Sequence, residues 1–234
     1  MATPFILVVC VTGVFCLTPL ALYLFGVSLL TRRDRPTVLS GPWDFVGLVV
    51  GLSGFFLVGG ALVLALLQSN FRYWMRGNFE SLRAAWGQEK LTWLMLAFLY
   101  LLGVVGVIAL TLAARRRSLV VYNIEPAALE AAVAEVFEYL GRVVERRGNG
   151  WHEGGRLLLE VDRFEAGHTA TLRWLSPDRV LFQEFERGLR EALAHHPSEE
   201  NPASRWLMAT AGGLGAWALC CLGLLFVYVF SGGR

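Results

Sequence analysis

Cysteine is scarce in this chain, and the positions of its few copies exclude two kinds of site. Only four cysteines occur among 234 residues, all in strongly apolar stretches: Cys10, Cys16, Cys220 and Cys221. The more polar parts of the chain therefore have no thiol for a disulfide framework or a thiolate metal site. In apolar surroundings cysteine most often serves as a small packing residue, and we expect that role for all four.

Charge is missing from four long runs, and this absence indicates the class of protein. Hydrophobic residues make up 55% of the chain and the mean hydropathy is +0.51, well above the apolar share of an ordinary soluble protein. Each run is at least as long as the roughly 20 residues that a helix needs to cross a bilayer, and the runs cover 4–30, 43–67, 91–113 and 206–230. We therefore predict a multi-pass, α-helical integral membrane protein with four transmembrane helices over 1–31, 43–67, 91–114 and 205–231.

Lysine is almost absent, since Lys90 is the only one among 21 basic residues, so arginines must orient the helices. Seven of them flank the predicted spans on what would be one side of the membrane: Arg32, Arg33, Arg35, Arg115, Arg116, Arg117 and Arg205. Cytoplasmic flanks of spans are enriched in basic residues, so the short basic loop 32–42 and the segment after the third span are predicted to be cytoplasmic. The basic residues within 68–90 oppose that orientation. We expect the protein in a bacterial inner (cytoplasmic) membrane.

The segment 68–90 joins the second and third spans and is rich in aromatic residues, which favour the membrane-water boundary. Phe79, Leu82 and Trp86 follow one another at spacings of three and four, so one face of a helix here would be apolar. We predict an amphipathic segment lying in the interface, with four aromatic anchors: Trp74, Phe79, Trp86 and Trp93. The alternative is a surface on which a partner docks.

Ionisable residues are absent from the cores of the predicted spans, where they would mark a transport path or a site. The nearest is Asp44, which follows Gly41 and Pro42 at the start of the second span. There a carboxylate suits the positive end of the helix dipole, so we expect a capping role rather than a substrate or proton role. Small residues are plentiful instead and allow close helix packing: Gly47, Gly51, Gly54, Gly103, Gly106, Gly212 and Gly215.

Between the third and fourth spans, residues 118–196 are predicted to form a soluble α+β domain, and the polar residues 197–204 a linker. A β-rich run opens the domain, and Pro126 then begins an amphipathic helix. Hairpin and alternating patterns indicate three or four further strands, and Ser176 or Asp178 caps a second amphipathic helix. Two such helices on one face of an antiparallel sheet form a two-layer, ferredoxin-like sandwich.

Catalytic and metal-binding patterns are missing from this domain. All four histidines of the chain lie here without the spacing of metal ligands: His152, His168, His195 and His196. Glu160 and Asp162 share a strand face, and a solvated strand is a simpler interpretation than an acid-base pair. The domain has neither a Gly-rich phosphate loop nor a nucleophile motif. We therefore predict no enzyme activity, no catalytic residue, no cofactor and no metal.

Acidic residues outnumber basic ones in the inserted domain, with fifteen Asp and Glu against nine Arg between Ser118 and Ser204. Nucleic-acid binding relies on basic residues that neutralise phosphates, so nucleic acid is excluded as a partner. The first hypothesis is an accessory or scaffold subunit whose cytoplasmic domain binds a protein partner along an exposed sheet edge. The alternatives are a membrane sensor whose domain binds a small ligand, and a small transporter or channel subunit. The expected partners are the lipid bilayer and either another protein or further copies of this chain.

Overall fold

The computed structural model describes residues 2–67, 90–164, 167–194, 196–197 and 201–231. The chain forms two compact units. The helical unit comprises Met1–Leu24, Leu48–Leu110 and Thr210–Arg234, and the sheet unit comprises Phe25–Gly47 and Thr111–Ala209.

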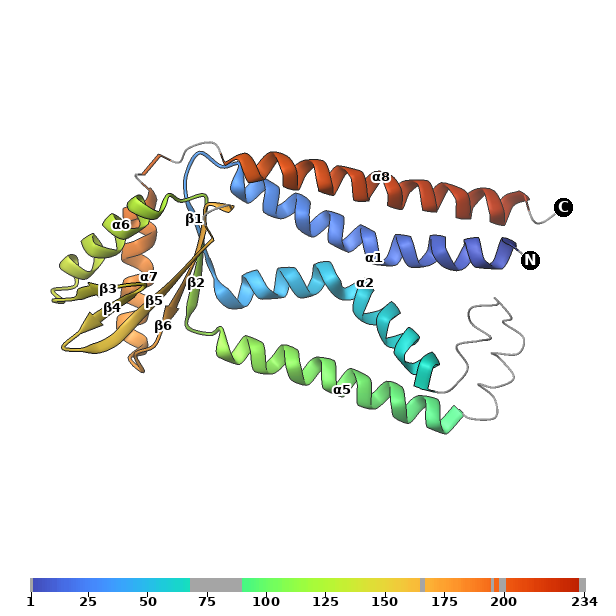
Figure 1. The fold of residues 1–234 in the computed structure, drawn as a ribbon, viewed down its shortest axis with the longest axis horizontal. Coiled ribbons are helices and arrows are strands. Elements are labelled where there is room, and N and C mark those ends of the chain that lie inside the picture. Colours follow the sequence, from blue (N-terminus) through green and yellow to red (C-terminus); the bar gives the residue numbers. More distant parts are fainter. Residues whose placement is uncertain (1, 68–89, 165–166, 195, 198–200, 232–234) are drawn as a thin grey trace. The chain divides into compact units, whose positions relative to one another are not determined.

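Among the described residues, four helices are long and apolar enough to cross a membrane, as the sequence predicts (Figure 1). They are α1 (Ala2–Thr31), α2 (Gly41–Leu67), α5 (Lys90–Ala114) and α8 (Pro202–Ser231). No more than 17% of the most apolar stretch of any of them is buried within the structure. Apolar side chains therefore cover the outside of these helices, an arrangement that water disfavours and lipid accepts.

Inside the helical unit, small residues and one hydrogen bond bring α2 close to its neighbours. A Cβ added at Gly54 would lie 2.0 Å from the backbone oxygen of Phe15, so α2 and α1 touch through their backbones at this point. Tyr100 of α5 donates a hydrogen bond to the carbonyl of Phe56 on α2 at 2.7 Å. Any larger side chain at position 54 would force α1 and α2 apart.

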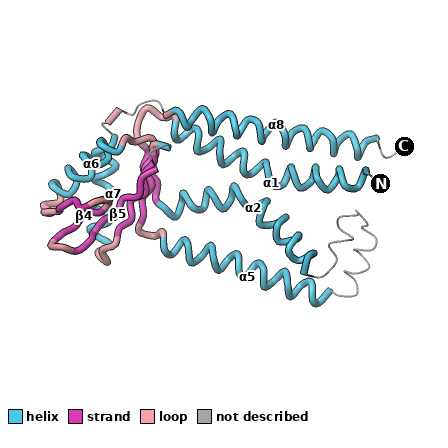
Figure 2. Tube along the Cα trace, viewed as in Figure 1, coloured by secondary structure: helices cyan, strands magenta, loops and turns pink. Residues whose placement is uncertain are grey.

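The sheet unit is built on a six-stranded antiparallel sheet and two helices (Figure 2). Its strands are β1 (Thr37–Ser40), β2 (Ser118–Tyr122), β3 (Glu145–Arg147), β4 (Gly150–Glu153), β5 (Arg156–Phe164) and β6 (Thr169–Trp174). They lie in the order β1-β2-β6-β5-β4-β3, and every neighbouring pair is antiparallel. The helices are α6 (Pro126–Tyr139) and α7 (Arg179–Ala194).

One hydrophobic core unites both helices with the sheet. Strand side chains alternate between the two faces, which buries Val121 of β2 and Leu172 and Trp174 of β6 in this core. The helices add apolar stripes at spacings of three and four: Leu129, Val133, Val136 and Phe137 from α6, and Leu181, Phe185, Leu189 and Leu193 from α7. The rings of Phe137, Trp174 and Phe185 meet at centroid distances between 5.2 and 6.3 Å. Each large apolar side chain buried here stabilises the domain by roughly 1.5–3 kcal/mol.

The loop after α1 contributes a strand, which corrects the predicted domain boundary. The sequence predicts a loop over 32–42 and a domain confined to 118–196, whereas β1 lies within that loop and pairs with β2. In this pairing Val38 faces Val121 and joins the core. The strand is four residues long, and two long apolar helices separate it in sequence from its partner β2. A local sequence pattern therefore does not reveal the pairing.

The inserted segment has the predicted order of one strand, one helix, three or four further strands and a second helix, which is not the order of a ferredoxin-like fold. That fold has the order β-α-β-β-α-β, whereas four consecutive strands separate α6 from α7 here. Gly148, Gly154 and Gly155 have positive φ and form the tight turns that join β3 to β4 and β4 to β5. These successive hairpins lay the four strands side by side and bring β6 next to β2.

Candidate functional site

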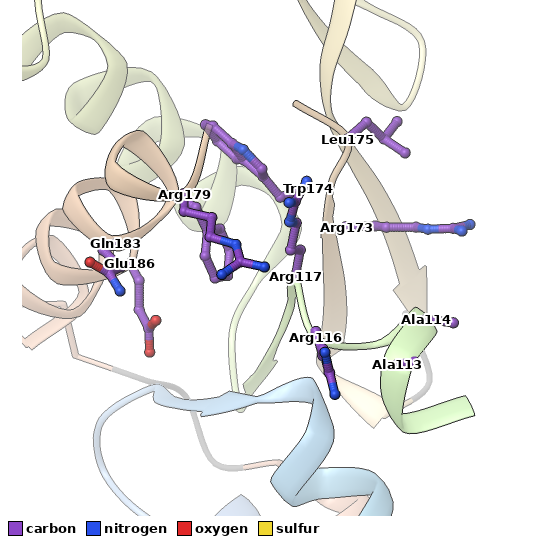
Figure 3. Close-up of a pocket in the computed structure, with 11 residues that line it drawn as sticks. Ala113, Ala114, Arg116, Arg117, Arg173, Trp174, Leu175, Arg179, Gln183 and Glu186 are labelled. Carbon is purple, nitrogen blue, oxygen red and sulfur yellow. The ribbon is translucent and has the colours of Figure 1, made fainter. Parts of the chain in front are cut away.

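An open cleft in the sheet unit is lined by four arginines (Figure 3). It has a volume of about 650 Å³ and lies where the end of α5, the end of β6 and the first turns of α7 meet. Its basic residues are Arg116, Arg117, Arg173 and Arg179. Its other lining residues are Ala113, Ala114, Trp174, Leu175, Phe182, Gln183 and Glu186. We call this feature the arginine cleft.

The helix α7 forms one wall of the arginine cleft. Arg179, Gln183 and Glu186 recur at intervals of four and three residues, so they share one face of the helix. Of the two caps that the sequence suggests for this helix, Asp178 makes the capping bonds. Its Oδ1 accepts from the backbone N–H of the second and third helical residues at 3.0 and 3.1 Å. A cap of this kind contributes roughly 0.5–2 kcal/mol and fixes where Arg179 begins the helix.

The opposite wall is held by pairing between Arg117 and the end of β6. The backbone N–H of Trp174 donates to the carbonyl of Arg117 at 2.8 Å, just beyond the paired residues of β2 and β6. The guanidinium of Arg117 donates from Nη1 to the carbonyl of Ser176 at 3.0 Å. Arg117 is therefore fixed through both its backbone and its side chain in the turn that follows α5.

The positive charge of the arginine cleft is not balanced by its own acidic residue. The carboxylate of Glu186 accepts from Nη2 of Arg190, one turn further along α7, at 2.7 Å. Among the residues that the structure describes, no carboxylate forms an ion pair with Arg116 or Arg179. Guanidinium groups without a carboxylate partner are suited to bind an external anion through several N–H donors.

Arg173 and Trp174 are adjacent residues of β6, so their side chains lie on opposite faces of the sheet. Figure 3 shows Arg173 pointing away from α7, while Arg179 extends from α7 toward the strands. Trp174 is 3% exposed, and its indole Nε1 has no hydrogen-bond acceptor in the described part of the chain. An unpaired buried donor costs about 1–3 kcal/mol, so this group is a candidate for completion by a bound molecule.

A second polar cluster joins the start of α2 to the sheet. Tyr122 of β2 donates a hydrogen bond from its phenol to Oδ1 of Asp44, and Nη1 of Arg115 lies 3.8 Å from Oδ2 of the same carboxylate. The guanidinium of Arg115 also lies over the ring of Phe45, 5.2 Å from its centroid. Asp44 lies in the first turn of α2, where the sequence expects a capping role. Its oxygens contact side chains from β2 and from the turn that follows α5, so Asp44 links the start of α2 to both.

Seven glycines are predicted to allow close helix packing, and their surroundings in the structure differ. An added Cβ would lie 2.7 Å from Tyr23 at Gly51 and 2.0 Å from Phe15 at Gly54. Four others would meet no described atom within 4 Å if they carried a Cβ: Gly103, Gly106, Gly212 and Gly215. Gly47 lies near the start of α2. Gly60, another small residue of the second span, lies close to the ring of Tyr100.

The arginines predicted to orient the spans all belong to the sheet unit: Arg32, Arg33, Arg35, Arg115, Arg116, Arg117 and Arg205. The three clusters that the sequence assigns to one side of the membrane therefore lie in one compact body. Of the four predicted aromatic anchors, Trp74, Phe79 and Trp86 lie outside the described residues. Trp93 lies in the first turn of α5 and is only 7% exposed, so it packs inside the structure.

Glu160, Asp162 and the histidines are the residues considered for catalysis or metal binding, and His195 lies outside the described residues. Glu160 and Asp162 are exposed on one face of β5. His168 has a φ of 47° in the turn before β6, and Nδ1 of His196, which follows α7, lies 3.0 Å from the carbonyl oxygen of Ala192 in the last turn of that helix. Within the described ranges, no three His, Cys, Asp or Glu side chains are grouped so that they could hold a metal ion.

Sequence patterns do not reveal the arginine cleft because three separate segments build it. The sequence explains Arg116 and Arg117 as topology signals, treats Arg173 as part of a strand alternation, and assigns no role to Arg179. One usable signal was present, namely an arginine triplet at the border between an apolar span and an acidic domain. The role of this triplet depends on which other charged side chains lie next to it in the folded structure.

Comparison of the chain with protein-family models, with curated proteins and with solved structures found no match. The function is therefore inferred from the chain's own residues. Two features of the sheet unit bear on it most directly, namely its cavities and the contacts that tie its sheet to the ends of the apolar helices.

Proposed function

We propose that the chain is a non-catalytic, multi-pass membrane protein that acts as an accessory or scaffold subunit. The sheet unit would lie on the cytoplasmic side, in keeping with its arginine clusters, and would present a docking surface to a protein partner. The bilayer would hold the four apolar helices.

The direct attachment of the sheet to the apolar helices supports a scaffold role. β1 ends at Ser40 and α2 begins at the next residue, while three arginines alone separate α5 from β2. Asn201 accepts a hydrogen bond from the N–H of Ala203 at the start of α8 and donates another to the carbonyl of Gly167 at 2.9 Å. A docked partner would thus be held at a fixed position relative to these helix ends.

The groove between α6 and α7 is the observation that carries this proposal. It has a volume of about 250 Å³ and is lined by Glu135, Val136, Tyr139, Gly188, Glu191 and Ala192. The two helices approach closely here, since a Cβ at Gly188 would lie 3.1 Å from Cγ1 of Val136. Tyr139, which lines the groove, is 85% exposed, and Val143, four residues further along the chain, is 86% exposed. Exposed aromatic and apolar side chains of this kind are typical of protein contacts.

The composition of the groove defines the chemistry of the partner. Ala192 and the ring of Tyr139 provide apolar surface above the buried Val136, and Glu135 and Glu191 add one carboxylate from each helix. A partner segment that carries an arginine or lysine among apolar residues would match both the shape and the charge. Tyr139 would then serve as an aromatic anchor at the edge of the contact.

Site-specific photo-crosslinking tests this proposal in native membranes. A photoreactive phenylalanine analogue at position 139 of the full-length chain is expected to capture a defined protein. The Glu135→Arg and Glu191→Arg double variant should abolish the crosslink by charge repulsion. The matched control, Glu138→Arg with Glu184→Arg, changes exposed carboxylates on the same two helices outside the groove and should retain it. A crosslink that survives the first variant, or that also forms from position 180 on α7, would refute the groove as the docking site.

A membrane sensor whose sheet unit binds a small ligand is the second candidate function, and the arginine cleft favours it. The turn that lines the cleft directly follows α5, so a bound ligand would contact the end of an apolar helix. A sensor role requires that ligand binding in the cleft change the packing of the helices in the helical unit. Cysteine crosslinking rates between α1 and α2, compared with and without bound ligand, measure that change directly, and rates that do not respond would reject the sensor role.

A further inference from the structure

The arginine cleft has the chemistry of an anion site. Guanidinium groups remain charged at all physiological pH values and bind oxyanions through paired N–H donors. Arg116 lies in the turn after α5, whereas Arg179 is the first residue of α7, so two separate elements supply the charges. Arg117 lies between these elements, and its hydrogen bond to the carbonyl of Ser176 fixes its guanidinium.

The acidic domain leaves these particular arginines available to an external anion. In the same domain, Arg146 and Arg163 both form ion pairs with Glu130. The carboxylate that lines the cleft, Glu186, is ion-paired with Arg190. No carboxylate in the described part of the chain pairs with the arginines at 116 and 179. Arg156 and Arg187 also have no ion pair among the described residues, but they lie outside the cavity, whereas Arg116 and Arg179 line it.

The arginines on the walls of the cleft indicate which shape of anion would bind there. A planar carboxylate accepts paired hydrogen bonds from one guanidinium group. A tetrahedral phosphate can accept hydrogen bonds from several guanidinium groups at once. Figure 3 shows Arg179 extending from α7 toward the strands with Arg117 beside it, and Arg116 nearer the end of α5. Because the arginines of the cleft come from separate elements, an anion that accepts hydrogen bonds from several directions suits them better than a planar one.

The position of the cleft in the chain also favours phosphate. α5 has 25 residues and is therefore about 37 Å long, which exceeds the roughly 30 Å of bilayer hydrocarbon. If α5 crosses the membrane, Arg116 directly after it lies at the depth of the lipid headgroups, where phosphates are abundant. The last α5 residues, Ala113 and Ala114, line the same cavity and give it an apolar side.

We propose that the arginine cleft is a binding site for a phosphate group, bound chiefly by Arg116, Arg117 and Arg179. The phosphate belongs either to an anionic phospholipid headgroup or to a soluble phosphate ester. This inference names the ligand chemistry of the sensor candidate and rests on that candidate's cleft. Partner docking in the groove between α6 and α7 uses other residues. Phosphate binding and the change in the helical unit are measured in separate experiments. If the cleft binds phosphate but the helices do not change, the sensor role is refuted and the phosphate site is not.

The test uses the purified full-length chain in a neutral detergent. Native mass spectrometry measures retention of phosphatidylglycerol, with diacylglycerol as the matched lipid without phosphate. Calorimetry with inorganic phosphate and with glycerol 3-phosphate tests the soluble source. The test variant is Arg116→Gln with Arg179→Gln. The control, Arg156→Gln with Arg187→Gln, removes the same charge from exposed positions of the domain outside the cleft.

We expect at least a tenfold loss of affinity for the phosphate-bearing ligand in the cleft variant and less than a twofold change in the control. Loss of phosphatidylglycerol alone assigns the site to lipid, and loss of the soluble ligands assigns it to a phosphate ester. Gln183→Glu adds a negative charge to the cleft without removing any contact, and it should weaken binding even if the double variant unfolds. Absence of binding by all phosphate ligands, equal retention of diacylglycerol, or equal affinities in cleft and control variants would overturn the proposal.

Discussion

Tyr122 donates a hydrogen bond to the carboxylate of Asp44 and so joins β2 to the first turn of α2. Both side chains are shielded, since Tyr122 is 8% exposed and the side chain of Asp44 is 17% exposed. β1 immediately precedes α2 and pairs with the same strand, β2. The edge strand is thus secured by its backbone ladder and by this side-chain contact.

Removal of the Tyr122 phenol should destabilise the sheet unit. Tyr122→Phe deletes a hydrogen bond to a charged acceptor, which contributes about 1.5–3 kcal/mol, and Asp44→Asn weakens the same contact. The double variant should lose less than the sum of the single variants, because both act on one interaction. Thermal unfolding in detergent, followed by near-ultraviolet circular dichroism, measures the effect. Tyr139→Phe is the control, since that phenol is exposed, and strict additivity would contradict the coupling.

A side chain at position 41 should be incompatible with the junction between β1 and α2. A Cβ added at Gly41 would lie 1.9 Å from Oγ of Ser118 and 3.1 Å from its carbonyl oxygen. Gly41→Ala should therefore lower the melting temperature by several degrees, at about 2–4 °C for each kcal/mol lost.

Removal of the Ser118 hydroxyl provides a matched rescue for this clash. Ser118→Ala deletes the nearest atom but leaves the carbonyl contact, so the double variant should recover part of the lost stability. Differential scanning fluorimetry of the purified chain compares the four proteins. A Gly41→Ala variant as stable as the parent would show that β1 and β2 do not pack in this way.

Local patterns account for most elements of the fold. Pro126 can begin a helix because its missing N–H is not needed there, and α6 does begin at this residue. Leu181, Phe185 and Leu189 have the period of a buried helical stripe and form it in α7. The pairing of Val38 with Val121 depends instead on a contact between distant segments, and four residues of β-like sequence are too short to predict it.

The candidate site is harder to predict than the fold for a related reason. A basic cluster beside a span has an adequate explanation in membrane topology, so Arg116 and Arg117 do not stand out as ligand residues. Their further role becomes visible only when the fold brings Arg179 to the same cavity and pairs Glu186 with Arg190. Charge balance in three dimensions is not a property of any single segment of sequence.

The close contact between α1 and α2 should make Gly54 intolerant of substitution. A Cβ there would lie 2.0 Å from a backbone oxygen of α1, which cannot move independently of its helix. Gly54→Ala should therefore reduce the thermal stability of the purified chain in detergent. Gly103→Ala is the matched control, because a Cβ at that position meets no described atom within 4 Å. The control should be neutral or gain up to about 1 kcal/mol from helix propensity, and equal losses in both variants would contradict the packing.

The arginine clusters predict that the sheet unit and the C-terminus lie on opposite sides of the membrane. Asn149→Cys places a thiol in the exposed turn between β3 and β4, and a cysteine added after Arg234 marks the terminus. In intact spheroplasts a membrane-impermeant maleimide should label the terminal thiol, whereas the thiol at 149 should react only after lysis.

The parent chain provides the blank for this labelling, because its cysteines lie in α1 and α8 within the apolar helices. Labelling of position 149 alone in intact spheroplasts would reverse the orientation. Both positions labelled alike would contradict an odd number of crossings between them. That last result would remove the membrane-spanning role of α8, the one apolar helix between Asn149 and the terminus among the described residues.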